Sequence, residues 1–287
     1  MEGWSSQLFS QPDAKVFVVL DGAKVRGLVK QLEEAQPEYC CLYRGELIPE
    51  LAEVVPYLVR LERETEFLEW VLSGMGKQWG IFAVAKANLR TMCQHFRSLL
   101  TVELPSGQTV AFRFYDPRVF RVFWPTCEEE KQRLVFGPIL RYLVEEEKGQ
   151  TFLHFMPPEL RSDAQIEKKR LVIREEQREV LKQYMVKQFE ERMVLHLRRV
   201  FPEKIKFLSE QELRTQTQRG INQSAQYQIT VEGDVQRYLE CAVVYGWDFH
   251  ATSWAREILC HNDWNGEMKM DKIEQTGLAL FDGKGGA

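Results

Sequence analysis

The hydrophobic pattern is most regular between residues 79 and 125, where its period changes along the chain. The run WGIFAVA at residues 79–85 is almost wholly apolar, as in a strand that is covered on both faces. Apolar side chains then recur at helical spacing from Leu89 to Leu100, and Asn88 stands at the position of an N-cap. This part of the stretch therefore predicts a buried strand followed by an amphipathic helix.

After this helix the hydrophobic period falls to two. Apolar residues alternate with polar ones over residues 102–104 and 110–115, and the turn sequence PSGQ separates the two runs. This pattern is typical of a β-hairpin with one buried face. Arg113 and Tyr115 are expected on the opposite face of that hairpin.

The hairpin is followed by a helix start. Asp116 precedes Pro117, which is the order of an N-cap and a proline at the first helical position. Arg118 and Arg121 should point away from the apolar side of this helix. Asp116 is thus interpreted as a structural cap, while the arginines and Tyr115 are either solvated structural residues or contacts for a partner protein.

The same stretch resembles a known protein family. WGIFAVAKANLRTMCQHFRSLL followed by VAFRFYDPRVF is similar to the adaptor/chaperone family of bacterial type VI secretion, whose members share a conserved domain of unknown function, and FRFYDPR is the most specific piece. The resemblance runs from about Val16 to the helices before the C-terminal tail. It implies a cytoplasmic, non-enzymatic chaperone that holds a toxic effector, often through the effector's N-terminal segment, and delivers it to the spike protein of the secretion machine.

Before residue 79 the pattern is that of a mixed α/β lobe. A β-branched strand at residues 15–20, an amphipathic helix over residues 25–32 and a short strand at residues 39–43 form a β-α-β opening, which favours a partly parallel sheet. A further strand is predicted near residues 57–61, and a further helix around residues 67–72.

Beyond the central stretch the chain becomes helical. Residues 135–144 suit either a strand or a helix, and no convincing strand follows Ile173. Four helices are predicted, marked by an apolar stripe at residues 180–200, a capping box at Ser209 and Glu212, and helical spacing over residues 231–242 and 254–259. The stripe at residues 180–200 is interpreted mainly as lobe-packing core, and the second helix is expected to stop near Gly220.

These patterns together predict an α+β protein with two lobes. A composition shift between residues 145 and 170 is typical of a lobe boundary. The predicted lobes are a mixed α/β lobe with a small sheet and a hairpin at residues 1–160 and an all-helical lobe at residues 161–280, with a disordered tail at residues 281–287.

Composition sets limits on the class of function. The chain has 287 residues and a formal net charge of −4, so it lacks the basic excess of a nucleic-acid-binding protein. The first residues do not resemble a signal peptide, and no apolar run reaches the roughly 18 residues of a membrane span. A soluble cytoplasmic protein without membrane insertion is expected. The six scattered cysteines are predicted to be reduced and mostly buried.

No linear catalytic motif is present. The phosphate-binding GxxxxGK[ST] and GxGxxG patterns, HExxH, GxSxG and CxxC are all missing, and no metal, cofactor or catalytic residue is assigned. Asp21 is interpreted as part of a turn with Gly22 rather than as a catalytic carboxylate, and His196 as a core histidine with one hydrogen-bond partner. The cluster from Cys260 to Asp263 is interpreted as a buried cysteine beside a surface histidine.

Two hypotheses about function follow. The first is a non-enzymatic adaptor with two interfaces and a cleft between its lobes, in which Trp247, Trp254 and Trp264 are either binding hot spots or core. The alternative is an α/β enzyme, hydrolase-like, that uses a carboxylate at Asp21 or Asp116.

Overall fold

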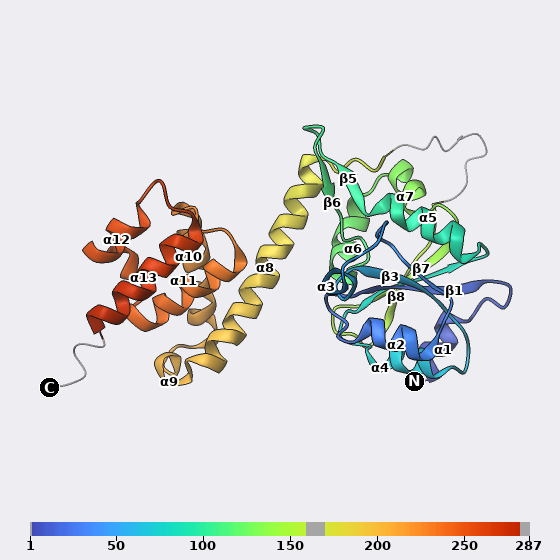
Figure 1. Cartoon of the computed structure of the whole chain (residues 1–287), viewed down its shortest axis with the longest axis horizontal. Coiled ribbons are helices and arrows are strands. Elements are labelled where there is room, and N and C mark those ends of the chain that lie inside the picture. The colour runs from blue at the N-terminus through green and yellow to red at the C-terminus, as the bar shows by residue number, and fades with distance from the viewer. Residues whose placement is uncertain (1, 159–169, 282–287) are drawn as a thin grey trace. The chain divides into compact units, whose positions relative to one another are not determined.

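The computed structural model describes residues 2–158 and 170–281. The chain forms two compact units, Met1–Leu181 and Lys182–Ala287, and each has an apolar core of its own. The first unit contains a sheet with helices, and the described part of the second is helical (Figure 1). The predicted α+β class is therefore confirmed. The predicted lobe boundary at residues 160 and 161 lies outside the described residues.

A six-stranded sheet forms the centre of the first unit, with the strand order β2-β3-β1-β4-β7-β8. Its strands are β1 (Lys15–Asp21), β2 (Tyr39–Cys41), β3 (Pro56–Leu61), β4 (Gly80–Ala85), β7 (Ile139–Glu145) and β8 (Phe152–Phe155). Every neighbouring pair in this sheet is antiparallel. The prediction of a partly parallel sheet is wrong for this reason: β1 and β2 run in the same direction, but β3 lies between them and pairs with both.

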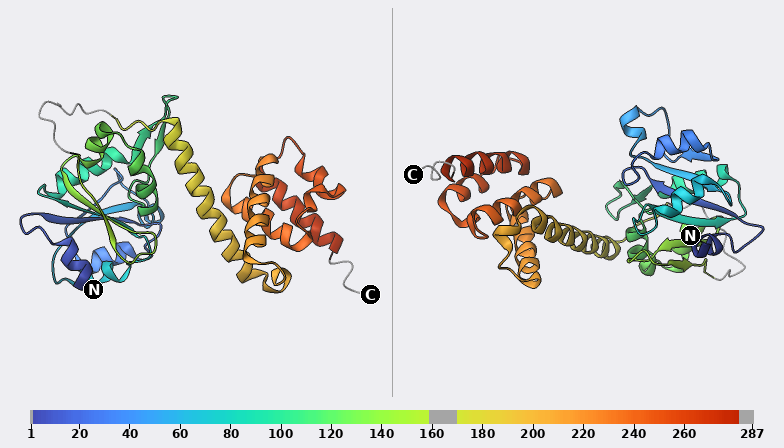
Figure 2. Two further views of the ribbon diagram at one scale, coloured as in Figure 1. Left: turned by 180° about the vertical axis from the view of Figure 1, so that it is seen from behind. Right: turned by 90° about the horizontal axis from the view of Figure 1, so that it is seen from below.

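The sheet has an apolar core on each face. Along β1, Phe17 and Val19 join one core, and Val16, Val18 and Leu20 join the other, because side chains alternate across a strand. Helices α5 (Leu89–Leu99), α6 (Pro117–Phe123) and α7 (Glu129–Phe136) cover the first face. Helices α1 (Glu2–Leu8), α2 (Leu28–Ala35) and α4 (Glu66–Ser73) cover the second (Figures 1 and 2). The unit is thus a three-layer α/β/α arrangement.

The central stretch folds largely as its pattern predicts. All six residues of β4 are buried, as expected for a strand covered on both faces. The Asn88 side chain accepts a hydrogen bond from the backbone N–H of Thr91 at 2.9 Å and caps α5. Residues 135–144, which the sequence left undecided, contain the end of α7 and most of β7.

The predicted hairpin is shorter than its sequence pattern. Its strands are β5 (Thr101–Glu103) and β6 (Thr109–Ala111), so the expected strand from residue 110 to residue 115 ends early. The Phe112 N–H still bonds the Leu100 oxygen at 2.8 Å, but the strand does not continue. The Phe112 and Phe114 rings pack into the core, 4.9 Å from the Phe123 ring and 5.5 Å from the Phe96 ring respectively. After β6 the segment therefore packs against α6 and α5 instead of extending the hairpin.

The second unit packs its helices around a separate apolar core. Its helices are α8 (Glu175–Val200), which enters the unit at Lys182, and α9 (Pro202–Ile205), α10 (Glu210–Gln226), α11 (Glu232–Tyr245), α12 (Ser253–Leu259) and α13 (Gly266–Phe281). The predicted capping box is present: Glu212 N–H bonds the Ser209 hydroxyl at 3.2 Å, and Ser209 N–H bonds the Glu212 carboxylate at 2.8 Å. Helix α13 was not predicted. Residues 282–287 of the predicted tail lie outside the described residues.

Helix α10 does not stop at Gly220. A Cβ on this glycine would lie 2.5 Å from the Leu239 side chain, so Gly220 permits a close approach of α10 to α11 instead of ending the helix. In α8 the predicted apolar stripe is only half buried: Phe189 and Leu197 lie in the core, whereas Val180 is 40% exposed. Among the described helices, α8 included, none is both long and apolar enough to cross a membrane.

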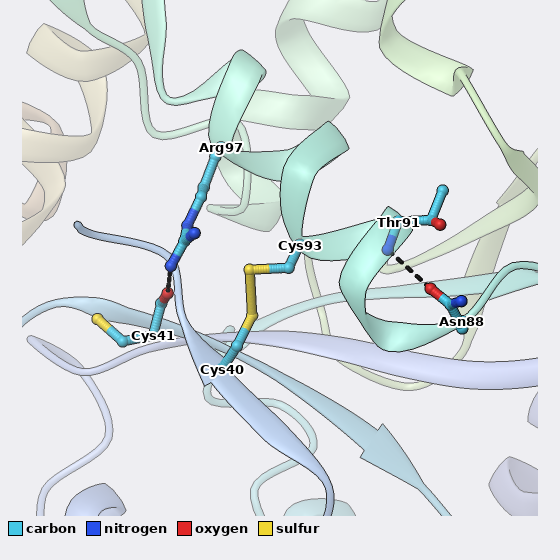
Figure 3. The surroundings of a disulfide bond; sticks show 6 residues. All are labelled: Cys40, Cys41, Asn88, Thr91, Cys93 and Arg97. Carbon is cyan, nitrogen blue, oxygen red and sulfur yellow. Dashed lines mark hydrogen bonds between the residues drawn. A yellow bond between two sulfur atoms is a disulfide. The ribbon is translucent and has the colours of Figure 1, made fainter.

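Two cysteines are paired, contrary to the prediction of reduced thiols. Cys40 in β2 and Cys93 in α5 form a disulfide, 53 residues apart in the sequence (Figure 3). The pairing arises because α5 packs across β2 on one face of the sheet, which the sequence does not show. The Arg97 guanidinium reinforces this contact by donating a hydrogen bond to the backbone oxygen of Cys41 at 2.8 Å. The remaining thiols are free: two are buried, Cys41 is half-buried and Cys260 is exposed.

Candidate functional site

Five of the residues singled out from the sequence lie in one segment that leads into α6. They are Arg113, Tyr115, Asp116, Arg118 and Arg121. The fold places this segment beside the C-terminal end of β1, where Asp21 is the last residue of the strand. The two carboxylates proposed from the sequence therefore belong to one polar cluster, although 95 positions separate them.

Asp116 is the anchor of this cluster. Its carboxylate accepts a hydrogen bond from the backbone N–H of Arg118 at 3.0 Å, which confirms the predicted N-cap. The Arg118 guanidinium adds bonds of 3.1 and 2.8 Å, and the Lys24 ammonium donates a further bond of 2.8 Å. Burial raises the pKa of Asp116, but the hydrogen bonds and charges of Arg118 and Lys24 outweigh it and hold the pKa at about 2.

Asp21, unlike Asp116, is poorly supplied with hydrogen-bond donors. Its side chain is 1% exposed, one carboxylate oxygen accepts the Ala23 backbone N–H at 3.1 Å, and the other oxygen has no hydrogen-bond partner. The nearest guanidinium nitrogen of Arg113 is 4.0 Å away, which is too far for a hydrogen bond. Burial raises the pKa of Asp21, and the charges of Arg113 and Lys24 only partly oppose this. The turn predicted at Asp21 and Gly22 is present, but it provides no hydrogen-bond donor for the second, buried carboxylate oxygen of Asp21.

A second group of contacts continues from Arg121 to the end of β7. Arg121 donates a 2.8 Å hydrogen bond to the Gln78 side-chain oxygen and another to the backbone oxygen of Glu145. The buried Glu145 carboxylate accepts the Gly76 backbone N–H at 2.7 Å, and burial raises its pKa. Arg121 therefore links the loop before β4 to the end of β7 through hydrogen bonds. This contact gives a structural role to a residue that the sequence suggested as a partner contact.

Sequence reasoning missed Lys24 and Glu145. Lys24 lies in the turn after β1, and its partner Asp116 is 92 residues away, so no local pattern marks the pair. In the sequence, Glu145 is the first of a run of glutamates at the predicted lobe boundary. The available signal was its place directly after residues 139–144, a run that is apolar except for Arg141, which makes it the last residue of a mostly buried strand.

The remaining members of the segment differ in exposure. Tyr115 is 4% exposed, so the expectation that it faces outward with Arg113 is wrong, and burial raises its pKa. The Arg113 side chain is 62% exposed and that of Arg118 is 26% exposed. Arg113 is thus the member of this segment that is most open to another molecule.

The three tryptophans considered as hot spots all lie in the second unit and are partly buried there. Trp247 packs against the apolar core, and Trp254 meets the Tyr245 ring at 5.7 Å between centroids. Trp264 stacks on His261 with centroids 3.9 Å apart. Each has a structural partner, and their role in binding a partner protein stays a prediction.

The other candidates from the sequence fall into structural places. His196 was predicted to be a core histidine with one hydrogen-bond partner. Its ring is partly buried and has two partners, the Glu240 carboxylate at 2.7 Å and the Gln236 amide at 3.3 Å. Cys260 is exposed rather than buried, which corrects the prediction. Within the described residues, no group of three or more His, Cys, Asp or Glu side chains could hold a metal ion.

The chemistry of the polar cluster is set by its two aspartates. Carboxyl groups whose pKa values are shifted in opposite directions can serve as a proton donor and a proton acceptor. Asp116, however, is occupied by Arg118 and Lys24, whereas the free oxygen of Asp21 has no donor. The cluster is therefore first a junction that fixes α6 to β1, with Asp21 as its one unsatisfied carboxyl group among the described residues.

Fold and site together define a two-unit α+β protein whose polar junction joins β1 to α6. Residues 16–134 match the model of a family described as Domain of unknown function (DUF4123). The matched segment begins in β1 and includes Asp21, Lys24 and the whole stretch from Arg113 to Arg121, while Glu145 and the helical unit lie beyond it. Comparison with curated proteins and with solved structures gave no match.

Proposed function

We propose that this protein is a non-enzymatic adaptor and chaperone that binds and stabilises an effector of a bacterial type VI secretion system and loads it onto the spike protein. The observation that carries the proposal is the match of residues 16–134 to DUF4123, a family linked to type VI secretion. In this proposal the protein acts in the cytoplasm, before the effector leaves the cell, and the bound part of the effector is its N-terminal segment.

The architecture is suited to such a role. An adaptor needs one interface for the effector and one for the spike protein, each of about 800 Å² per partner. The two units have separate apolar cores, so each can present its own surface. Arg113 and the three tryptophans remain the proposed partner contacts, with Arg118 and Arg121 acting through the polar junction.

The direct test is co-expression with the effector that is encoded beside this protein. The expected result is that the effector is soluble and co-purifies with this protein, and that it precipitates or is degraded when this protein is deleted. A matched pair of variants sharpens the test, since Arg113→Glu reverses an exposed charge, while Arg256→Glu reverses one on α12 of the other unit. An effector that stays soluble and abundant without this protein would overturn the chaperone function.

One observation favours a second candidate function, a hydrolase-like enzyme. The buried Asp21 carboxyl has a raised pKa, an oxygen without a hydrogen-bond partner and Lys24 nearby, which are properties of a general acid or base. If the protein is such an enzyme, it should hydrolyse p-nitrophenyl acetate or p-nitrophenyl phosphate, and Asp21→Asn should abolish that activity while alanine at His196 or His261 should not. An adaptor would show no Asp21-dependent turnover.

A further inference from the structure

A ridge of exposed apolar side chains stands on the segment that joins β2 to β3. It consists of Ile48, Leu51 and Val54, which are 65%, 38% and 47% exposed, around the single-turn helix α3 (Pro49–Ala52). The Leu51 N–H bonds the Ile48 oxygen at 3.0 Å, and the Val54 N–H bonds the Leu51 oxygen at 3.1 Å. Successive turns of this kind align side chains three residues apart. The three residues therefore form one line, the 48–54 ridge.

The base of this ridge is fixed to the sheet. Val55 is buried, and its backbone oxygen accepts the N–H of Gly22 at 3.2 Å. A Cβ at Gly22 would lie 2.5 Å from that oxygen, so the close approach requires glycine. The Tyr57 hydroxyl also bonds the Ala52 oxygen at 3.0 Å, and the Tyr39 ring, 41% exposed, lies 6.1 Å from the Tyr57 ring. The ridge is thus preformed, which lowers the entropic cost of binding a partner.

The charge around the 48–54 ridge is one-sided. Glu46, Glu50 and Glu53 are exposed and lie between or beside the apolar residues, and within residues 44–54 Arg44 is the one basic residue. In the described part of the chain none of these three carboxylates has an ion-pair partner, whereas Glu38 on the neighbouring strand segment is paired with Arg60 at 2.8 Å. An apolar ligand that covered the ridge would bring its own flanks next to these three carboxylates.

We propose that the 48–54 ridge binds an amphipathic helix of a partner protein, with an apolar face that covers the ridge and Lys or Arg residues on its flanks. An amphipathic helix binds a partner through apolar side chains spaced three or four residues apart. The basic flanks follow from complementarity to Glu46, Glu50 and Glu53. The inference rests on the proposed adaptor function, because it assigns the chemistry of the client segment and the surface that receives it.

The test uses the full chain and a synthetic helix as the probe. A fluorescent peptide of about 18 residues, five helical turns, carries Leu on one face and Lys on both flanks. Two comparison peptides have the same length: one has Glu in place of every Lys, and the other has the Leu and Lys residues in scrambled order. Fluorescence anisotropy should show that the basic amphipathic peptide binds at least about tenfold more tightly than either comparison peptide.

Variants of the protein locate the site. Leu51→Asp should weaken binding of the basic peptide by about tenfold or more, since it places a charge in the apolar contact. The double variant Glu50→Lys/Glu53→Lys should reverse the preference toward the acidic peptide. The matched control is Leu195→Asp on α8, where an exposed leucine is followed by Arg198 and Arg199; this change should leave binding unaltered. Circular dichroism melts confirm that each variant is folded.

Three results would overturn the inference. Equal binding of the basic and the scrambled peptides would mean non-specific charge attraction to a chain of net charge −4. Binding that is indifferent to Leu51→Asp would place the site elsewhere. If analytical sedimentation shows that wild type self-associates and that Leu51→Asp does not, the ridge binds a second copy of this chain instead. The co-expression test measures the solubility of the effector and uses no peptide. If the peptide does not bind the 48–54 ridge but the effector still needs this protein to stay soluble, the ridge inference fails and the proposed adaptor function is retained.

Discussion

The ammonium of Lys24 donates a hydrogen bond to the carboxylate of Asp116 across 2.8 Å and so joins the turn after β1 to the N-terminus of α6. Both side chains are largely buried, with exposed fractions of 20% and 5%. The same carboxylate caps α6 and holds the Arg118 guanidinium. One buried carboxylate therefore accepts hydrogen bonds from the Lys24 ammonium, the Arg118 guanidinium and one backbone N–H, which come from two parts of the chain.

Replacing Asp116 with Ala should destabilise the protein strongly. The variant loses a helix cap, worth about 1 kcal/mol, and leaves Lys24 buried without its counter-charge, so we expect a total loss of about 3 kcal/mol or more. Urea unfolding followed by circular dichroism measures this loss. Glu38→Ala is the matched control, since its exposed pair with Arg60 should contribute less than about 1 kcal/mol.

The Asp116 contacts also predict a dependence of stability on acid. The folded-state pKa of about 2 lies below the ordinary value near 4 of an unfolded chain, so the stabilisation is complete above about pH 4 and is lost as the pH falls through about 2. The free energy of unfolding of wild type should decline in this window relative to that of Asp116→Asn. Parallel pH curves for the two proteins would contradict the assignment.

Asp21 predicts the reverse dependence. Its pKa is raised by burial, so its contribution to stability is fully present below about pH 4, the unfolded value, and is lost as the pH rises through the folded-state pKa. Asp21→Asn cannot ionise. Its stability should therefore improve relative to wild type as the pH is raised from about 4 to 7, as measured by urea unfolding at each pH. A constant difference between the two proteins would refute the raised pKa.

The Cys40–Cys93 disulfide should stabilise the first unit. Closing a loop of this length restricts the unfolded chain by up to about 4 kcal/mol, and reduction by dithiothreitol should lower the free energy of unfolding by about 2–4 kcal/mol. The Cys93→Ser variant should match the reduced wild type and be insensitive to dithiothreitol. Cys260→Ser, at an exposed free thiol, should behave as oxidised wild type.

The cores of the two units should respond separately to mutation. Leu197 is fully buried in the helical unit, and Leu197→Ala should cost about 3 kcal/mol there. Hydrogen exchange measured by mass spectrometry should accelerate in α10, α11 and α13 and stay unchanged in β1 and β4. Leu195→Ala, two positions away and 69% exposed, is the control and should change exchange in neither unit. Acceleration in the sheet would indicate one cooperative unit instead of two.

Sequence reasoning succeeded where the cause of structure is local. The apolar run of β4, the Asn88 and Asp116 caps and the Ser209–Glu212 box each depend on residues within a few positions of one another, and each is found in the structure. The split into a mixed lobe and a helical lobe followed from the same local periodicity.

It failed where distant segments meet. Whether β2 pairs with β1 or with β3 depends on strand order, so the sheet was predicted to be partly parallel when its pairs are antiparallel. The Cys40–Cys93 bond and the Lys24–Asp116 pair depend on the same order. Tyr115 was also predicted wrongly. The alternation of polar and apolar residues places it on the outer face of a strand, but the strand ends at Ala111 and the Tyr115 ring lies in the core.

The strand order has a practical consequence for work with fragments. The family match ends at residue 134, but β4 forms its second ladder with β7 (Ile139–Glu145), and Ile173 is buried in the same core. A truncated protein that stops at the end of the match would expose the backbone of β4 along one side, a template on which other chains can add strands and aggregate. Soluble expression of the first unit therefore calls for a chain that continues through β8 and past Ile173.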